Sequence, residues 1–363
     1  MPQGVISSLV LALSVLLAGL LPGIASTAAS CSVESTATDK TGSLVRHLAG
    51  ECSLSEREAH AVNSALIMQA LTKGHPVDLV GVIVRGDLLL DDLPVQTAHM
   101  PKGLSAQQQD ALAQLNSGDV RLVHGPLTIR NSVMEGSVRH RSVKGTLQFE
   151  GPVDVRGTTF KEGVDLSRSV FQGAVDLSAA KFERESYFVH GQFAQTLTCK
   201  ETRFGLHTRF HRSVFRGAVD CTAALFDGMA EFLEVTFEQP VAMEHVRFGS
   251  GTGFSGSRFM RHTSFSEAVF SRDTFFGFTV FEGDVSFRDA RFLGSADFSD
   301  AEFKRPDDLM KARFDRKPLL IRTKRATQEQ EKGLLQSPAG QYTVTLFFLL
   351  LAALLVAYAM KIK

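Results

Sequence analysis

A phenylalanine recurs at every eleventh position through the middle of the chain, and no other feature of the sequence restricts the fold as strongly. The sixteen positions are Phe149, Phe160, Phe171, Phe182, Phe193, Phe204, Phe215, Phe226, Phe237, Phe248, Phe259, Phe270, Phe281, Phe292, Phe303 and Phe314. Six residues after each of the first fifteen stands another apolar side chain. A small or β-branched residue stands two positions before nearly every one of these, and side chains two apart in an extended segment share a face. The pattern predicts short strands that each turn one small and one large side chain inward.

The second apolar set alternates in composition, and this alternation indicates the size of a coil. Every second member is almost always phenylalanine, as at Phe188, Phe210 and Phe232, whereas the members between them are mixed, as at Cys199 and Met243. Two populations alternating at 22 residues predict a coil of about 22 residues with four short sides. A helical supercoil is disfavoured because glycine recurs within the period.

The segments from Phe281 to Phe292 and from Phe292 to Phe303 show the repeat at its most regular. They resemble the pentapeptide-repeat family in its phenylalanine-rich form, an 11-residue double repeat, and the resemblance extends from Phe149 to Phe314. It implies an all-β fold, a right-handed quadrilateral β-helix with side chains layered in a narrow dry lumen. The extra residue in every second repeat departs from the family pattern, so one turn is expected to be longer and the cross-section less regular.

The rest of the chain is expected to close and anchor this solenoid. Asn63 and Ser64 can cap a helix from Ala65 to Thr72 that Gly74 ends, and open solenoid ends need caps. The expected segments are an N-terminal cap with a short helix (31–76), irregular first coils (77–148) with a polar insertion (91–119), the regular solenoid (149–316), and a C-terminal cap with a juxtamembrane linker (317–341).

Both termini contain apolar segments that indicate export and membrane anchoring. Residues 1–30 are interpreted as a signal peptide or a retained N-terminal hydrophobic segment. Residues 342–360 contain no charge and, as a helix, would extend about 28 Å, close to the thickness of a bilayer core. We therefore expect a single C-terminal transmembrane helix, a solenoid on the extracytoplasmic side and a cytoplasmic C-terminus with Lys361 and Lys363.

Four cysteines in an exported chain raise the question of disulfides. Cys31 and Cys52 both precede the solenoid, and a bridge between them is one of two open alternatives. Cys199 and Cys221 are one predicted coil apart, close enough for a disulfide. Stacked reduced thiols that act as small apolar side chains are the favoured interpretation for this second pair.

No catalytic residue, cofactor or metal is predicted. The sequence has no glycine loop for phosphates, no serine elbow and no His-Glu-x-x-His motif. His207 and His211 have a spacing found in metal sites, but they are expected to lie on different sides of the solenoid. The acidic residues stand where outward repeat positions must be polar, so choosing two as an acid and a base would be arbitrary.

One group of residues suggests a binding surface. Phe275 and Phe278 flank the inward Phe276, with Val280 nearby, so at least one of the two flanking rings is expected to face outward. An exposed apolar patch would indicate a partner site. A turn packed on itself is the slightly favoured alternative.

The leading functional hypothesis is a non-enzymatic, membrane-anchored scaffold or protein-interaction module outside the cytoplasm, with an unidentified protein partner. A DNA-mimicking, topoisomerase-interacting protein, suggested by some members of the resembled family, is disfavoured. Residues 149–316 carry 21 basic and 25 acidic groups, a net charge of only −4, and nucleic acid is not an expected partner either. An enzyme with a site in the polar insertion (91–119) is the third hypothesis.

Overall fold

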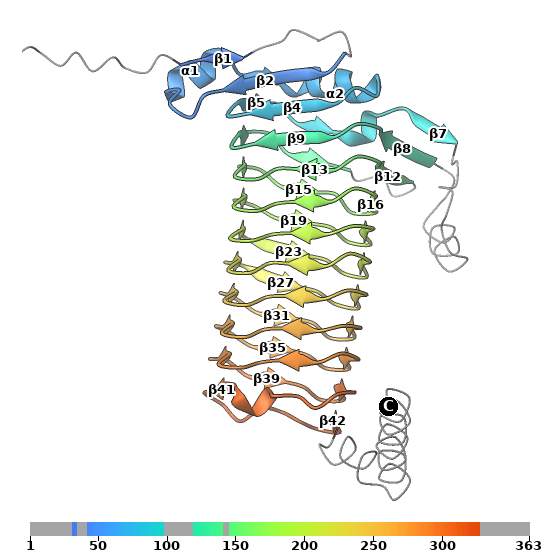
Figure 1. The fold of residues 1–363 in the computed structure, drawn as a ribbon, viewed down its shortest axis with the longest axis vertical. Helices are drawn as coiled ribbons and strands as arrows, with labels where there is room; N and C mark the ends of the chain where they lie inside the picture. Colours follow the sequence, from blue (N-terminus) through green and yellow to red (C-terminus); the bar gives the residue numbers. More distant parts are fainter. Residues whose placement is uncertain (1–30, 35–41, 98–118, 141–144, 327–363) are drawn as a thin grey trace, which may run out of the picture.

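The chain winds into a four-sided β-solenoid of about eleven turns, shown by a computed structural model in which residues 31–34, 42–97, 119–140 and 145–326 are described (Figure 1). Three of its sheets have eleven strands and the fourth has nine. Residues one coil apart pair in parallel, as Phe149 pairs with Phe171 and Val153 with Val175, so the coils from Phe149 onward have 22 residues each. The earlier coils are longer, since Leu127 pairs with Val153 and Val77 with Leu127. The predicted coil length and the four sides are confirmed.

Sheet A begins with the one antiparallel pair of this side, β1 with β2, and continues in parallel. Its strands are β1 (Val33–Glu34), β2 (Leu44–Leu48), β4 (Val77–Val80), β9 (Leu127–Arg130), β13 (Val153–Asp154), β17 (Val175–Asp176), β21 (Leu197–Thr198), β25 (Val219–Asp220), β29 (Val241–Ala242), β33 (Thr263–Ser264) and β37 (Val285–Ser286).

Sheet B follows sheet A along each coil and carries one of the two columns of the phenylalanine ladder. Its strands are β3 (Val62–Asn63), β5 (Ile83–Arg85), β10 (Val133–Met134), β14 (Thr159–Phe160), β18 (Lys181–Phe182), β22 (Arg203–Phe204), β26 (Leu225–Phe226), β30 (Arg247–Phe248), β34 (Val269–Phe270), β38 (Arg291–Phe292) and β41 (Arg313–Phe314).

Sheet C is the shortest sheet and lies opposite sheet A. Its strands are β6 (Leu88–Leu89), β11 (Val138–Arg139), β15 (Val164–Asp165), β19 (Ser186–Tyr187), β23 (His207–Arg209), β27 (Met229–Glu231), β31 (Thr252–Gly253), β35 (Thr274–Phe275) and β39 (Ala296–Asp297).

Sheet D completes each coil and carries the second ladder column. Its strands are β7 (Val95–Thr97), β8 (Asp119–Val123), β12 (Thr146–Phe149), β16 (Ser169–Phe171), β20 (Gln192–Phe193), β24 (Val214–Phe215), β28 (Thr236–Phe237), β32 (Arg258–Phe259), β36 (Val280–Phe281), β40 (Glu302–Phe303) and β42 (Lys324–Arg325). β7, at the start of the polar insertion, pairs antiparallel with β8.

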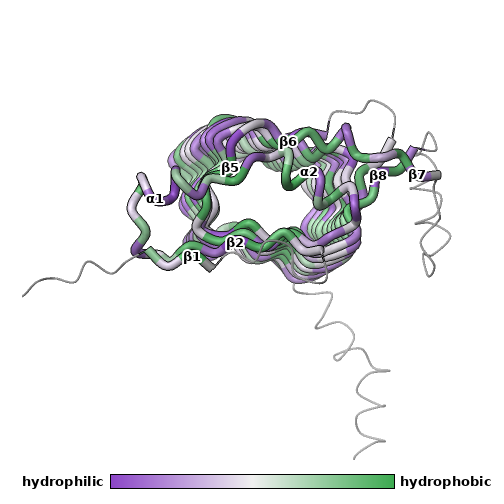
Figure 2. Tube along the Cα trace, turned by 90° about the horizontal axis from the view of Figure 1, so that it is seen from above, coloured by the Kyte–Doolittle hydropathy of each residue, from purple (hydrophilic) through white to green (hydrophobic). Residues whose placement is uncertain are grey.

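The phenylalanine ladder forms two columns of parallel rings inside the rod. Phe149 stacks on Phe171 in sheet D with ring centroids 4.9 Å apart, and Phe160 stacks on Phe182 in sheet B at 4.8 Å. Fifteen of the sixteen ladder rings are buried and Phe314, in the last coil, is half-buried. Figure 2 shows the coils superposed along the axis in an elongated four-sided outline, so the register stays regular from coil to coil.

Each coil has two corners at which one residue adopts a left-handed backbone. These residues recur at a spacing of eleven from Arg168 to Arg322, except at position 311, and the non-glycine members have φ between 53° and 58°. The corner is closed by a backbone hydrogen bond such as Thr158 N to Val155 O, 3.1 Å. Buried hydroxyls near the corners are satisfied by the preceding coil, since Thr158 Oγ1 donates to Ile129 O at 2.6 Å.

Two helices pack at the N-terminal end of the rod (Figure 1). α1 (Leu54–Ala59) begins with a capping box between Ser53 and Glu56. α2 (Ser64–Thr72) has Asn63 as its N-cap, as the sequence predicts, and buries Ile67 and Leu71 against β2, β3, β4 and β6. Two short 3₁₀ turns, η1 (Leu90–Asp92) and η2 (Leu309–Lys311), complete the described elements.

The two predicted hydrophobic segments, 1–30 and 342–360, lie outside the described residues, as does most of the polar insertion (91–119). Within the part of the chain that the structure describes, no helix has the length and apolarity needed to span a membrane.

Candidate interaction surface

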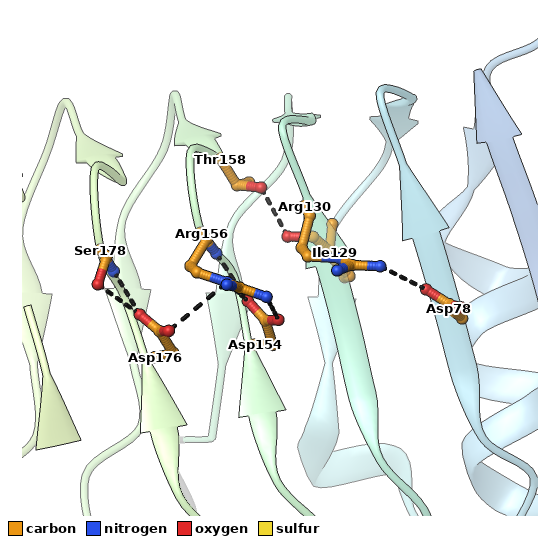
Figure 3. Close-up of polar contacts among 8 residues, drawn as sticks. All are labelled: Asp78, Ile129, Arg130, Asp154, Arg156, Thr158, Asp176 and Ser178. Atoms are coloured by element: carbon orange, nitrogen blue, oxygen red, sulfur yellow. Dashed lines mark hydrogen bonds and ion pairs between the residues drawn. The ribbon is translucent and has the colours of Figure 1, made fainter. Parts of the chain in front are cut away.

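The repeated aspartates on the outside of the rod are occupied in shaping its turns. Asp154 Oδ1 accepts a hydrogen bond from the backbone N–H of Arg156 at 3.2 Å, and Asp176 accepts one from the N–H of Ser178 at 2.9 Å (Figure 3). The Arg156 guanidinium also pairs with both carboxylates, at 2.6 Å to Asp154 and 3.5 Å to Asp176. Short polar side chains that bond their own backbone two residues on are a standard turn device. These carboxylates on sheet A therefore serve the architecture.

Sheet C departs from this uniform pattern. The outward column that includes β15 to β39 reads Asp165, Tyr187, Arg209, Glu231, Gly253, Phe275 and Asp297 from one coil to the next. The matching column of sheet A contains only aspartate and the small residues threonine, alanine and serine from Asp154 to Ser286. Large, chemically different side chains are thus concentrated on sheet C.

A polar cluster occupies the middle of sheet C. Glu231 Oε2 lies 2.7 Å from His207 Nε2, 2.9 Å from Arg209 Nε and 3.3 Å from His211 Nε2. The prediction that the two histidines lie on different sides is wrong, because the imidazoles of His207, in β23, and of His211, in the turn that follows, both reach Glu231 Oε2. No group of metal-ligating side chains suited to hold an ion is found among the described residues.

The electrostatics of this cluster follow from partial burial. Burial would raise the pKa of the Glu231 carboxyl, but hydrogen bonds from His207 and Arg209 outweigh it and hold that pKa below its ordinary value. Burial lowers the pKa of the His211 imidazole in spite of the nearby Glu231 charge. The Arg209 guanidinium also lies 5.3 Å from the centre of the Tyr187 ring, in cation–π range.

An apolar patch follows on the next coils of sheet C. The side chains of Phe275 and Phe278 are 47% and 67% exposed, so this turn is not packed on itself. Gly253, one coil earlier than Phe275, has no side chain, and Leu233 Cδ2 lies only 2.8 Å from where a Cβ of that glycine would be. Val280, in β36, is half-buried on sheet D. We call Leu233, Phe275 and Phe278 the sheet C patch.

Phe278 has an unusual backbone for its side chain. It stands in the left-handed corner column with φ 57°, where a bulky residue is uncommon and costs about 1–2 kcal/mol. The other residues of positive φ in the described part of the chain are charged, small or polar. An exposed aromatic ring on a strained backbone contributes little to folding, so Phe278 is the residue on this surface most suggestive of a function.

Toward the N-terminal end, sheet C is hollowed beside Tyr187. The hollow, about 520 Å³, is lined mainly by acidic and small residues, Asp87, Ser137, Arg139, Glu162, Gly163, Val164, Asp165, Glu185 and Tyr187. Asp87 accepts hydrogen bonds from the Ser137 N–H and hydroxyl, both 2.8 Å, and pairs with Arg139 at 3.2 Å. These bonds hold the pKa of Asp87 below its ordinary value.

The described interior of the solenoid contains a small apolar cavity. A cavity of about 50 Å³ in the first regular coils is lined only by apolar side chains, among them Leu166, Leu177 and Phe188. Small-molecule sites usually measure about 300–1,000 Å³ and contain a few polar groups.

The structure pairs both sets of cysteines. Cys31 and Cys52 form a disulfide with Cα atoms 4.6 Å apart, joining the chain before β1 to the residues before α1. Cys199 and Cys221, in neighbouring coils, are also paired, with Cα atoms 4.4 Å apart. The favoured sequence interpretation, two stacked reduced thiols, differs from this second pairing.

Comparison with known families agrees with the architecture. Residues 265–309 match the family model described as pentapeptide repeats (9 copies). This segment lies within the predicted solenoid (149–316) and confirms the resemblance based on the phenylalanine ladder. Comparisons with curated proteins and with solved structures gave no match.

Proposed function

We propose that this chain, which carries pentapeptide repeats and winds them into a four-sided β-solenoid, is a non-enzymatic scaffold that is anchored in a membrane and binds a protein partner outside the cytoplasm. Sheet C is the proposed binding side. The observation that carries this assignment is Phe278, an aromatic side chain that is 67% exposed on a left-handed backbone.

The arrangement of sheet C supports a protein partner. Exposed apolar patches beside polar rims are typical of interaction sites, and aromatic and arginine side chains are enriched there. The sheet C patch borders the cluster of Glu231, Arg209 and Tyr187, so both kinds of contact are offered on one flat side.

Two features of the sequence and fold support the proposed location. The uncharged segment 342–360 has the length of a membrane span. The Cys31–Cys52 disulfide is a bond that persists mainly in oxidising compartments.

The alternatives have weaker support. A DNA mimic needs dense negative charge, whereas sheet C places Arg209, His207 and His211 around a single glutamate. The outward aspartates of sheet A, which an enzyme could have used, are bonded into turns.

The test compares binding by the full chain with a variant in which Phe275→Asp and Phe278→Asp are combined. One coil further on, aspartate already occupies both positions: Asp297 pairs with Phe275 in sheet C, and Asp300 is the corner residue that corresponds to Phe278. The fold should therefore tolerate both substitutions. Affinity purification from envelope membranes, with quantitative mass spectrometry, is expected to show a specific protein whose recovery falls by about tenfold in the variant.

The matched control is Leu293→Asp, at an exposed leucine directly after β38 of sheet B, whose column also contains Asp227 and Asp315. This control should leave recovery unchanged. Equal recovery with the wild-type chain and the double variant would refute sheet C as the binding side, and the absence of any specific protein would count against the scaffold itself.

A further inference from the structure

The last coil of the solenoid has a net charge opposite in sign to that of the coil before it. Residues 282–303 carry two basic and six acidic groups, whereas residues 304–325 carry nine basic and three acidic groups. A switch from −4 to +6 between adjacent coils is confined to the end of the rod. It gives this end an electrostatic character that the regular repeat does not need.

Part of this positive charge forms no ion pair within the described residues. Arg325 pairs with Asp307 and Arg322 with Asp300, while Lys304 pairs with Glu302. Within the described residues, four exposed basic side chains of the last coil form no ion pair: Arg305, Arg313, Arg316 and Lys317. Their charges are available to an anionic partner.

The same end also exposes apolar side chains. Met310 is 62% exposed, Leu319 47% and Ile321 55%. Leu320, one coil after the buried Phe298, is 36% exposed, and it belongs to the last coil that the structure describes. We call Met310, Leu319, Leu320 and Ile321, with the four unpaired basic residues, the terminal face.

From these observations we propose that the terminal face docks on an anionic lipid bilayer surface. Apolar side chains among lysines and arginines match the interface, where the apolar groups enter the headgroup region and the cations meet lipid phosphates. This inference rests on the proposed anchoring by residues 342–360. Only 15 residues, 327–341, separate the described chain from that segment, so this end would lie within about 50 Å of the bilayer.

The positive charge of the terminal face favours a bilayer over the other candidate partners for this surface. A second copy meeting end to end would bring two coils of net +6 together, which is repulsive. Residues 327–341 of the chain itself contain Glu329 and Glu331 and are the remaining alternative, which the experiment distinguishes.

The test uses the full chain reconstituted in liposomes of phosphatidylcholine with or without 30% phosphatidylglycerol, all doped with brominated lipid. An environment-sensitive fluorophore is attached to an introduced cysteine, Ile321→Cys at the terminal face or Leu54→Cys in α1 at the far end. Quenching by brominated lipid is expected at position 321 and not at position 54. It should rise with phosphatidylglycerol and fall in high salt.

A charge variant gives the matched comparison. Combining Arg313→Glu, Arg316→Glu and Lys317→Glu should shift the docked-to-free ratio by about tenfold or more, since each basic residue near an anionic surface contributes to binding. The same three reversals at exposed arginines within the rod, Arg261, Arg272 and Arg288, should leave quenching at position 321 unchanged.

Failure of this inference can be told apart from failure of the anchoring. If the wild-type chain does not float with the liposomes after carbonate extraction, the proposed anchoring is wrong. If it floats but position 321 is quenched no more than position 54, or equally in both lipid mixtures and in the charge variant, docking of the terminal face is overturned.

Discussion

Arg325 donates two hydrogen bonds to Asp307, at 2.8 and 2.5 Å. Arg325 pairs with Phe303 of the preceding coil, so it occupies the position at which the phenylalanine column of sheet D would continue. The Asp307 side chain is only 1% exposed, while Arg325 is about one-third exposed. Arg325 therefore stands where a further regular coil would place a phenylalanine, and an ion pair takes the place of another aromatic ring at this end of the column.

Removing this pair should weaken the end of the rod. Asp307→Ala is expected to lower the free energy of unfolding by about 1–3 kcal/mol, because Arg325 loses its buried partner but keeps contact with water. Chemical denaturation followed by circular dichroism measures the change. The control is Asp315→Ala, an exposed aspartate in the same coil, and an equal effect of the two substitutions would contradict the assigned role of the pair.

Filling the apolar cavity should stabilise the early coils. Leu166→Phe would extend the column of Phe188, Phe210 and Phe232 by one ring into the cavity that Leu166 lines. We expect the free energy of unfolding to increase by about 1 kcal/mol, from added burial and one more stacked pair. The reverse change, Phe188→Leu, should lower it by a similar or larger amount. A loss of stability in Leu166→Phe would show that the cavity cannot accept the ring.

The corner residues should discriminate between side chains by backbone conformation alone. Ala223 is exposed and has φ 58°, so Ala223→Val is expected to cost about 1–3 kcal/mol, whereas Ala223→Gly should be tolerated. Ala242→Val in β29, on an ordinary strand, is the control and should be nearly neutral. Thermal unfolding ranks the three variants, and equal melting temperatures for the two valine variants would contradict the argument.

Stability should fall as the solution becomes mildly acidic. Burial lowers the pKa of the His140 imidazole below 6.5, although a hydrogen bond with Ser167 O and the charge of Asp91 act in the opposite direction. The unfolded chain then binds the proton first, so this contribution to stability is present above about pH 6.5 and is lost as the pH falls through and below that value. His190 and His211 have pKa values lowered by burial in the same way.

Denaturation midpoints measured from pH 7.5 to pH 5 check this dependence. His140→Gln should flatten the decrease, and His60→Gln, at the C-cap of α1, serves as the comparison. A midpoint that is constant over this range, or one that rises toward pH 5, would oppose the assignment.

The core of this molecule could be predicted because its positions repeat. Each buried column contains like residues at intervals of 22, so counting along the sequence gives the sides, the coil length and the inward residues. The surface could be predicted only in part. The position of Phe275 and Phe278 on either side of Phe276 predicts that at least one of them faces outward, but their exposure depends on the corner geometry and on Gly253 one coil away.

The remaining contacts have no periodic signal. Asp307 and Arg325 are 18 residues apart, and their pairing depends on how the last coil leaves the register. Glu231 lies one coil after Arg209, and it contacts Arg209 together with the histidines two residues before and after that arginine, His207 and His211. The spacing of the two histidines alone does not reveal this contact. Contacts of this kind become visible only once coils are stacked in space.

The fixed register has a consequence for how such a protein can change over time. Because every inward column of the regular coils, from Phe149 onward, returns after 22 residues, a duplication or deletion of one such coil leaves all neighbouring pairs intact. Each such event would move the two ends of the rod apart or together by one strand spacing, about 4.8 Å. The solenoid is in this sense a spacer of adjustable length, in which the distance between its ends can vary stepwise while the chemistry of those ends is preserved.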